Sequence, residues 1–154
     1  MTVTKKCLSI VIPAKNEGPS LQSFLPQLKS AYPDAEIILV NDGSSDDTSL
    51  ICTECGVIEV RHSYSKGNGA AIKSGARRAT GDVIVFMDGD GQHDPDDIPR
   101  LLSRLEEGFD MVIGARGSKS QASFGRLAAN RVYNRLASWM VGHKIHDLTS
   151  GFRA

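Results

Sequence analysis

The stretch from Val83 to Pro95, VIVFMDGDGQHDP, passes abruptly from apolar to acidic residues. Val83 to Met87 are apolar and rich in β-branched types, which is typical of a strand buried on both faces of a sheet. Asp88 and Asp90 follow directly, spaced by glycines and with no lysine or arginine beside them. Two carboxylates this close repel each other, and a hard cation such as Mg2+ or Mn2+ would relieve the repulsion. The stretch therefore predicts a metal site at the end of a buried strand.

Two other structures compete for the same residues. Asp and Gly also make ordinary turns, because Asp accepts hydrogen bonds from backbone amides and Gly tolerates a positive φ. A calcium loop of the EF-hand type would take its first ligands from Asp88, Asp90 and Gln92. That loop also needs Gly where His93 stands, Glu where Pro99 stands and a helix before it. All three requirements fail, so the ordinary turn remains the alternative to a metal site.

Length, charge and cysteine content narrow the class of protein. The 154 residues suit one domain with a substantial core. Lys plus Arg and Asp plus Glu number 18 each, so no overall field favours nucleic acid as a partner. No apolar run approaches the roughly 20 residues of a membrane span, and no signal peptide is recognised. Three cysteines are too few for a disulfide framework, which indicates the cytoplasm.

Cys52 and Cys55 form a CxxC pattern inside an expected helix. Such a pair can be a redox centre or half of a zinc site. No second CxxC accompanies it, and His62 is the only further ligand candidate nearby. We favour two small side chains that pack on one helix face.

Strand and helix patterns alternate along the chain, which predicts an α/β fold with a mostly parallel, twisted sheet and helices on both faces. The apolar strand candidates are Leu8–Pro13, Glu36–Asn41, Val57–Arg61, Val83–Met87 and Met111–Gly114. Helical patterns cover Ser20–Ala31, Asp46–Cys55, Gly69–Ala79 and Asp96–Glu107. Phe124–Val141 is amphipathic and fits a helix that packs on the core, with a membrane-surface helix as the alternative.

Three polar clusters follow the first, second and fourth expected strands, at 15–17, 41–43 and 88–92. Because ligands of open α/β sheets bind at the carboxyl ends of the strands, we expect these clusters to meet at one rim. Ser45 or Asp46 should cap the helix that follows the second strand. Asp42 is not needed for that cap and is free to accept hydrogen bonds from a nucleobase or a ribose hydroxyl.

Two further stretches favour a phosphate ligand only weakly. Lys66–Gly75, KGNGAAIKSG, would place glycines at a helix start, where backbone amides can hold phosphate. The P-loop pattern is absent, and Ile72 stands where GxGxxG needs its third glycine, so a turn that packs closely on the sheet is the alternative. Arg116 follows the fifth expected strand and suits a diphosphate. An exposed cation at a strand end explains Arg116 equally well.

Six motifs taken together resemble the inverting family-two glycosyltransferases of the GT-A fold, and among them the dolichyl- or polyprenyl-phosphate sugar transferases. They are PAKNE (13–17), VNDGS (40–44), KGNGAAIKSG (66–75), DGDGQHDP (88–95), GAR (114–116) and DLTSGFRA (147–154). Their order and spacing follow the family over the whole chain. The resemblance implies a Rossmann-like GT-A sheet and the transfer of a sugar from a UDP- or GDP-sugar donor to an acceptor.

The same resemblance assigns the site residues. Nucleoside binding falls to Pro13, Lys15, Glu17, Val40 and Asp42. The family's DxD motif corresponds to Asp88, Gly89 and Asp90, which would hold the ribose and Mg2+ or Mn2+, with Gln92 as a further metal ligand. Arg116 would lie near the phosphates and act as a catalytic residue that assists the departure of the diphosphate. Asp147 would be the catalytic base, unless the acceptor is a phosphate that needs none.

The resemblance also implies partners and limits. The acceptor would be a lipid phosphate, reached from the cytoplasm or at the cytoplasmic face of the membrane. Family members continue well beyond the GFR element, so residues 1–154 would form one nucleotide-sugar-binding domain that is truncated at its C-terminus. A non-catalytic nucleotide-sugar-binding module is therefore an alternative. A sugar nucleotidyltransferase is another, although it should carry a glycine- and basic-rich loop where this chain has PAKNEG.

Overall fold

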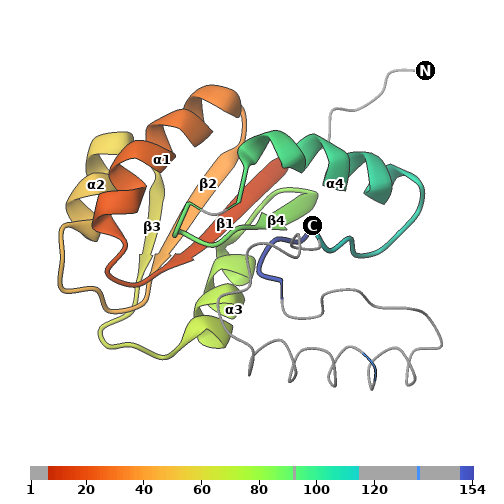
Figure 1. Cartoon of the computed structure of the whole chain (residues 1–154). Helices are drawn as coiled ribbons and strands as arrows, with labels where there is room; N and C mark the ends of the chain where they lie inside the picture. The colour runs from red at the N-terminus through yellow and green to blue at the C-terminus, as the bar shows by residue number, and fades with distance from the viewer. Residues whose placement is uncertain (1–6, 92, 115–134, 136–149) are drawn as a thin grey trace.

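The protein's structure, a computed structural model, describes residues 7–91, 93–114, 135 and 150–154. Strands and helices alternate along this part of the chain (Figure 1), as predicted. In chain order they are β1 (Leu8–Ala14), α1 (Gly18–Ala31), β2 (Glu36–Asn41), α2 (Thr48–Cys55), β3 (Ile58–Arg61), α3 (Asn68–Arg78), β4 (Val83–Phe86), the 3-10 turn η1 (Pro95–Asp97) and α4 (Ile98–Glu106).

The four strands form one parallel sheet in the order β3-β2-β1-β4. Parallel neighbours cannot be joined by a hairpin and need a crossover. Helices α1, α2 and α3 supply the crossovers from β1 to β2, from β2 to β3 and from β3 to β4. The predicted mostly parallel α/β sheet is confirmed, with all four carboxyl ends on one edge.

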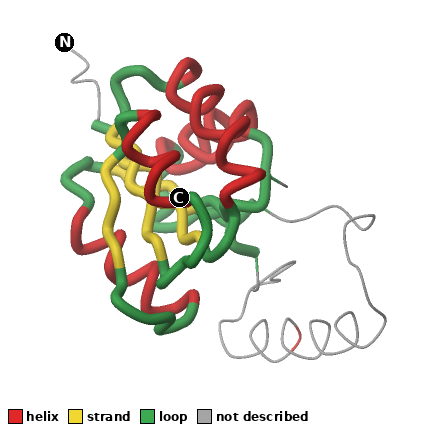
Figure 2. The backbone as a smooth tube through the Cα atoms, turned by 90° about the vertical axis from the view of Figure 1, so that its left-hand side faces the viewer, coloured by secondary structure: helices red, strands yellow, loops and turns green. Residues whose placement is uncertain are grey.

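Helices cover both faces of the sheet, as the view turned by 90° shows (Figure 2). Successive side chains of β1 point to opposite faces, because a strand has a period of two. Ile10 and Ile12 join the larger apolar cluster, with residues of α1, α2 and α4 such as Leu25. Val11 joins the smaller cluster, with Ala71 of α3. Both clusters contain fully buried side chains, so the sheet is the centre of the core.

Helix α3 lies unusually close to the sheet at Gly75. A Cβ on Gly75 would stand 2.2 Å from Val11 Cγ1 and 3.0 Å from Val40 Cγ2. Only a residue without a side chain permits this approach. The alternative interpretation of the KGNGAAIKSG stretch, a segment with small residues for close packing on the sheet, is therefore confirmed at this position.

The expected fifth strand at Met111–Gly114 does not form a regular strand: within this segment a single bridge joins Ile113 to Arg153. Phe152–Ala154 lies between the two segments and runs antiparallel to both, through bridges from Arg153 to Phe86 and to Ile113. Val112 and Ala154 exchange two backbone hydrogen bonds of 2.8 and 2.9 Å. The segment 112–114 still runs parallel to β4, but the chain's last described residues fill the space between them.

The expectation that Val83–Met87 is buried on both faces is only half right. Val85 and Met87 are fully buried in the larger cluster. Ile84 and Phe86 face the other side and are only partly buried against the smaller cluster. The reason is that α3 packs over β1 and β2, near the middle of the sheet, whereas β4 lies at the edge of the four-stranded ladder.

The predicted helix at Phe124–Val141 lies outside the described residues, apart from Arg135. Among the helices that are described, none is both long and apolar enough to cross a bilayer.

Candidate active site

The loops that follow β1 and β2 are joined at the carboxyl rim of the sheet. Asn16 N donates to Ser44 Oγ at 3.0 Å, and Asn16 Oδ1 accepts from Ser45 N at 2.9 Å. Asn16 adopts a left-handed φ of 54°, which asparagine tolerates better than most residues. Asp42 N donates to Ala14 O at 2.9 Å, directly below this junction. The predicted meeting of the polar clusters is confirmed for these two loops.

The residues expected around a nucleoside lie at this rim with different exposures. Lys15 is exposed, and Pro13 and Glu17 are half-buried at the end of β1. Val40 is fully buried, pairs with Pro13 in the sheet and packs against α3. The Val40 side chain therefore belongs to the core next to the rim and does not reach its surface. Contact between these residues and a nucleoside stays a prediction.

Asp42 is a buried carboxylate at the rim that accepts four hydrogen bonds. Its Oδ1 accepts from His62 Nδ1 at 2.6 Å and from Lys66 N at 2.8 Å. Its Oδ2 accepts from Ser65 Oγ and from Gly67 N, both at 2.8 Å. A carboxylate offers about four lone-pair sites, so these four donors occupy its capacity. Asp42, which is only 4% exposed, thereby anchors the loop between β3 and α3.

This environment keeps Asp42 ionised. Burial by itself raises the pKa of the Asp42 carboxyl, but the hydrogen bonds from His62, Lys66 N, Ser65 and Gly67 N outweigh it and hold the pKa far below its usual value. Because an ionised carboxylate can only accept hydrogen bonds, His62 Nδ1 must carry a proton and donate it. The second nitrogen of the ring, His62 Nε2, lies 2.9 Å from Ser74 Oγ.

Asp46, not Ser45, supports the start of α2. Asp46 Oδ1 accepts from Thr48 N at 3.2 Å, while the helix itself begins at Thr48 with Asp47 in the capping position. Asp46 Oδ2 also accepts from Gly18 N at 2.8 Å, at the start of α1. Burial raises the pKa of Asp46, but the hydrogen bonds from Thr48 and Gly18 lower it more, so the net shift is downward. The prediction that Ser45 or Asp46 caps α2 is therefore wrong, because the helix begins one residue later and Asp47 takes the capping position. Asp46 instead joins the starts of α1 and α2 through its two carboxylate oxygens.

The DGDG turn after β4 is held by a histidine. Asp88 N donates to His93 Nδ1 at 3.1 Å, which requires that nitrogen to be unprotonated. His93 Nε2 lies 3.8 Å from Asp88 Oδ2, and the ring stacks on Phe152 with centroids 5.2 Å apart. Gly89 packs on the end of β1, where a Cβ would stand 3.3 Å from Ala14 Cβ. Asp90 is exposed.

The last described segment reaches the same turn from a distant part of the sequence. A Cβ on Gly151 would stand 2.3 Å from Asp88 Oδ2 and 2.4 Å from Asp88 Oδ1. No residue with a side chain fits there unless Asp88 moves. The SGFR element therefore lies directly against the first carboxylate of the expected metal site.

The described residues fit a hard divalent cation that keeps other ligands. Asp88 and Asp90 offer carboxylate oxygens at a solvent-accessible edge, with the Asp88 side chain 35% exposed. Mg2+ typically takes one or two carboxylates and completes its shell with water and substrate phosphates. The described residues include no group of three or more His, Cys, Asp or Glu that could hold an ion. Two carboxylates at an accessible edge are compatible with an ion that takes its other ligands from water and substrate.

Three predicted site residues, Gln92, Arg116 and Asp147, lie outside the described residues. The sequence interpretation also missed His62 and His93 as members of the rim. His93 had a signal, because it follows the acidic turn within the DGDGQHDP motif. His62 had none, since 20 residues separate it from Asp42 and only the pairing of β2 with β3 brings them together.

The CxxC pattern has no role at this site. Cys52 is buried and Cys55 half-buried, and both are free thiols. Burial, followed by the nearby Glu59 and Cys55, raises the pKa of Cys52 to about 12. Such a thiol stays protonated at neutral pH and is a poor nucleophile. The packing interpretation is confirmed.

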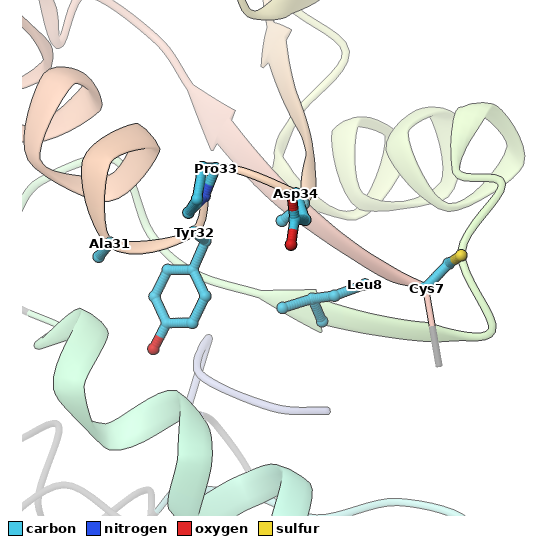
Figure 3. A pocket seen from close by; sticks show the side chains of 7 residues that line it. Cys7, Leu8, Ala31, Tyr32, Pro33 and Asp34 are labelled. Carbon is cyan, nitrogen blue, oxygen red and sulfur yellow. The ribbon is translucent and has the colours of Figure 1, made fainter. Parts of the chain in front are cut away.

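A separate hollow of about 330 Å³ lies at the amino ends of β1 and β2, opposite the rim (Figure 3). The Tyr32 ring forms one wall, and its hydroxyl donates to Pro95 O at 2.8 Å. Cys7, Leu8 and Asp34 line other parts of it. Of the predicted site residues that the structure describes, none lines this hollow.

Comparison with known proteins identifies related sequences. The model of the family described as Glycosyl transferase family 2 matches residues 9–154. An undecaprenyl-phosphate 4-deoxy-4-formamido-L-arabinose transferase from Klebsiella pneumoniae is 35% identical over 97% of this chain and 48% of its own length. A polyprenol monophosphomannose synthase from Mycolicibacterium smegmatis is 34% identical over 94% of this chain and 60% of its own length. The chain thus spans about half the length of the curated relatives it matches.

Solved structures share the fold. Glucosyl-3-phosphoglycerate synthase from Mycobacterium tuberculosis in complex with UDP has a TM-score of 0.77 and 24% identity, covering 97% of this chain and 56% of that one. The same enzyme with Mn2+, UDP and glucosyl-3-phosphoglycerate has a TM-score of 0.71 and 25% identity over the same shares. The fold of these structures is the predicted GT-A fold.

Proposed function

The chain belongs to glycosyl transferase family 2, and from this we propose that it binds a nucleotide-diphospho-sugar at the carboxyl rim for transfer to a polyprenyl or dolichyl phosphate. The observation that carries the proposal is the convergence on Asp88. The turn after β4, the end of β1 under Gly89, and Gly151 from the chain's last described residues all meet there. Relatives named as undecaprenyl-phosphate and polyprenol transferases support the acceptor class.

In the proposed donor complex, Asp88, Asp90 and Gln92 hold Mg2+ or Mn2+ beside the diphosphate. The bound ion supplies positive charge that offsets the charge developing on the departing diphosphate. Pro13, Lys15 and Glu17 shape the nucleoside side of the pocket, with Val40 beneath them. Asp42, whose oxygens already accept four hydrogen bonds, shapes it through the loop that follows β3. Arg116 adds a second cation near the phosphates. A neighbouring structure with Mn2+ and UDP supports a divalent ion and a nucleotide at this kind of site.

The proposed reaction is a single displacement at the anomeric carbon. An acceptor oxygen attacks from the face opposite the diphosphate, a new carbon–oxygen bond forms, and the nucleoside diphosphate leaves with the electron pair of the broken bond. The configuration is therefore inverted. A phosphate acceptor is already anionic and attacks without a base, whereas a hydroxyl acceptor gives its proton to Asp147. Transfer to a lipid phosphate would take place at the cytoplasmic face of the membrane.

Calorimetric titration tests donor binding. We expect a UDP- or GDP-sugar to bind the wild type in the presence of Mn2+, and binding to weaken strongly in a chelator or in Asp90→Ala. A CDP-sugar serves as the nucleotide control. Nucleotide-sugar binding that ignores both the chelator and the substitution would remove Asp90 and the ion from the site.

A turnover assay separates transfer from binding alone. The second candidate function is a nucleotide-sugar-binding unit without turnover. With a polyprenyl phosphate, Mn2+ and the donor that binds, transfer would release nucleoside diphosphate. Tight donor binding without release would support the second candidate.

A further inference from the structure

Asp42, His62 and Ser74 form a continuous chain of hydrogen bonds beneath the rim. They come from just past the end of β2, from just past the end of β3 and from the second turn of α3. Asp42 Oδ1 lies 2.6 Å from His62 Nδ1, and His62 Nε2 lies 2.9 Å from Ser74 Oγ. His62 is only 6% exposed. A histidine with both ring nitrogens engaged and almost no contact with water has its orientation fixed by its neighbours.

Asp42 also holds the loop between β3 and α3. Figure 1 shows this loop leading from the carboxyl edge of the sheet into α3. The Asp42 carboxylate accepts from the amides of Lys66 and Gly67 as well as from the Ser65 hydroxyl. Gly67 has a φ of 87° and occupies the capping position of α3. The carboxylate therefore holds the loop by its backbone, at the point where the helix begins.

The loop is also pressed against the second strand's end from the other side. A Cβ on Gly43 would stand 2.7 Å from Ser65 N and 2.8 Å from the Tyr64 carbonyl carbon. Gly43 itself has a φ of 70°, which favours glycine. The loop is therefore held from two sides, by the hydrogen bonds to Asp42 and by the close backbone contact with Gly43.

We propose that His62 is a positioning residue of the donor site. It does not touch substrate; it orients Asp42, and Asp42 sets the backbone of Ser65–Gly67 at the edge where the nucleoside binds. This inference rests on the nucleotide-sugar site proposed above. His62, although buried and far from Asp42 in sequence, would thus contribute to the affinity for the donor.

The test variants differ in whether the side chain at position 62 can still donate a hydrogen bond to Asp42. In His62→Asn the side-chain amide can still donate to Asp42, because Asn Nδ2 lies near the place of His Nδ1. In His62→Leu no donor remains, and the ionised Asp42 loses a charge-assisted hydrogen bond in a buried place. Ser74→Ala removes only the outer end of the chain. Its effect should lie between the wild type and His62→Leu.

The test measures nucleotide affinity and amide exchange on the same proteins. We expect His62→Leu to raise the Kd for UDP or GDP, whichever the wild type binds, on the order of 10-fold. His62→Asn should stay close to the wild type. In ligand-free protein, the amides of Lys66 and Gly67 should exchange with solvent faster in His62→Leu and at the wild-type rate in His62→Asn.

Ser9→Ala is the matched control for stability. Ser9 is fully buried and its hydroxyl bonds Glu36 Oε2 and Gly81 N, but it lies near the amino end of β1, away from the rim. We expect its Tm to fall while its Kd stays at the wild-type value. An equal rise of Kd in Ser9→Ala and His62→Leu would show a general loss of stability and overturn the positioning role.

The remaining outcomes separate this inference from the proposed function. If the wild type binds nucleotide and folded His62→Leu binds it equally well, the positioning role is wrong and the proposed site stands. Unchanged exchange of the Lys66 and Gly67 amides in His62→Leu also overturns it, with or without nucleotide. If the wild type binds no nucleotide, the proposed function fails and the positioning role fails with it.

Discussion

At the scale of single residues, the site depends on glycines that allow backbone to approach a carboxylate. Gly151 lies so close to Asp88 that a Cβ would stand 2.3 Å from its Oδ2. The Asp88 side chain therefore keeps its direction because position 151 has no side chain. The space that an expected metal ligand occupies is thus left open by a residue 63 positions away, a separation that no local motif reports.

Gly151→Ala should displace Asp88 and weaken metal binding. We expect roughly a 10- to 100-fold loss of Mn2+ affinity, as is usual when the support of a metal ligand is removed. Titration of Mn2+ in the presence of UDP measures it. Gly75→Ala is the control, since its Cβ would meet Val11 at 2.2 Å, in the core rather than at the site. Unchanged Mn2+ affinity in Gly151→Ala would show that a side chain at position 151 does not disturb metal binding by Asp88.

Asp42 should make stability depend on pH. Its folded pKa lies below the unfolded value, so its contribution is present above the unfolded pKa and is lost as pH falls toward the folded one. We expect Asp42→Asn to be less stable than the wild type by about 2 kcal/mol at pH 7. The difference should shrink below about pH 4. Urea unfolding at several pH values measures it, and a difference that is constant with pH would contradict the ionic role.

At the scale of elements, the segment Phe152–Ala154 joins the edge of the sheet to the site. Its backbone bonds both Phe86 and Gly114, and its phenyl ring is buried in the larger cluster. The same ring stacks on the imidazole of His93, and His93 Nδ1 accepts a hydrogen bond from Asp88 N. The Phe152 side chain thus belongs to the core and also contacts the histidine that supports the acidic turn.

Phe152→Ala should destabilise the fold by about 3–5 kcal/mol, because a large buried ring leaves a cavity. The exposed fraction of Phe152 is 6%, whereas that of Phe109 is 53%. Phe109→Ala, which removes the same ring from the surface, should cost roughly 0.5 kcal/mol or less. Denaturant unfolding compares the two. Equal losses would mean that the 152–154 segment does not belong to the core.

At the scale of the whole molecule, one rigid sheet carries a site assembled from loops. The strands and the helices on both faces form the apolar clusters, and the polar loops lie at the carboxyl edge. A ligand that bridges these loops should stabilise the entire fold, because binding to the native state alone shifts the unfolding equilibrium.

UDP and Mn2+ together should therefore raise the Tm of the wild type, while each alone has a smaller effect. At a ligand concentration of 100 times the Kd, the gain is about 2.7 kcal/mol. EDTA should abolish the joint effect, and Asp90→Ala should not show it. Thermal unfolding followed by fluorescence measures the change. A rise with UDP that is the same in EDTA would separate nucleotide binding from the metal.

The sequence by itself determined the α/β alternation, the parallel sheet and the rim at which the polar clusters meet. These follow from local patterns: runs of apolar residues, helix starts and the geometry of parallel strands. Only the tertiary structure decided that Phe152–Ala154 lies between β4 and the segment 112–114, that Gly151 lies against Asp88, and that Asp42 is held by His62. Each of these contacts joins residues far apart in sequence, and such contacts depend on how the layers pack.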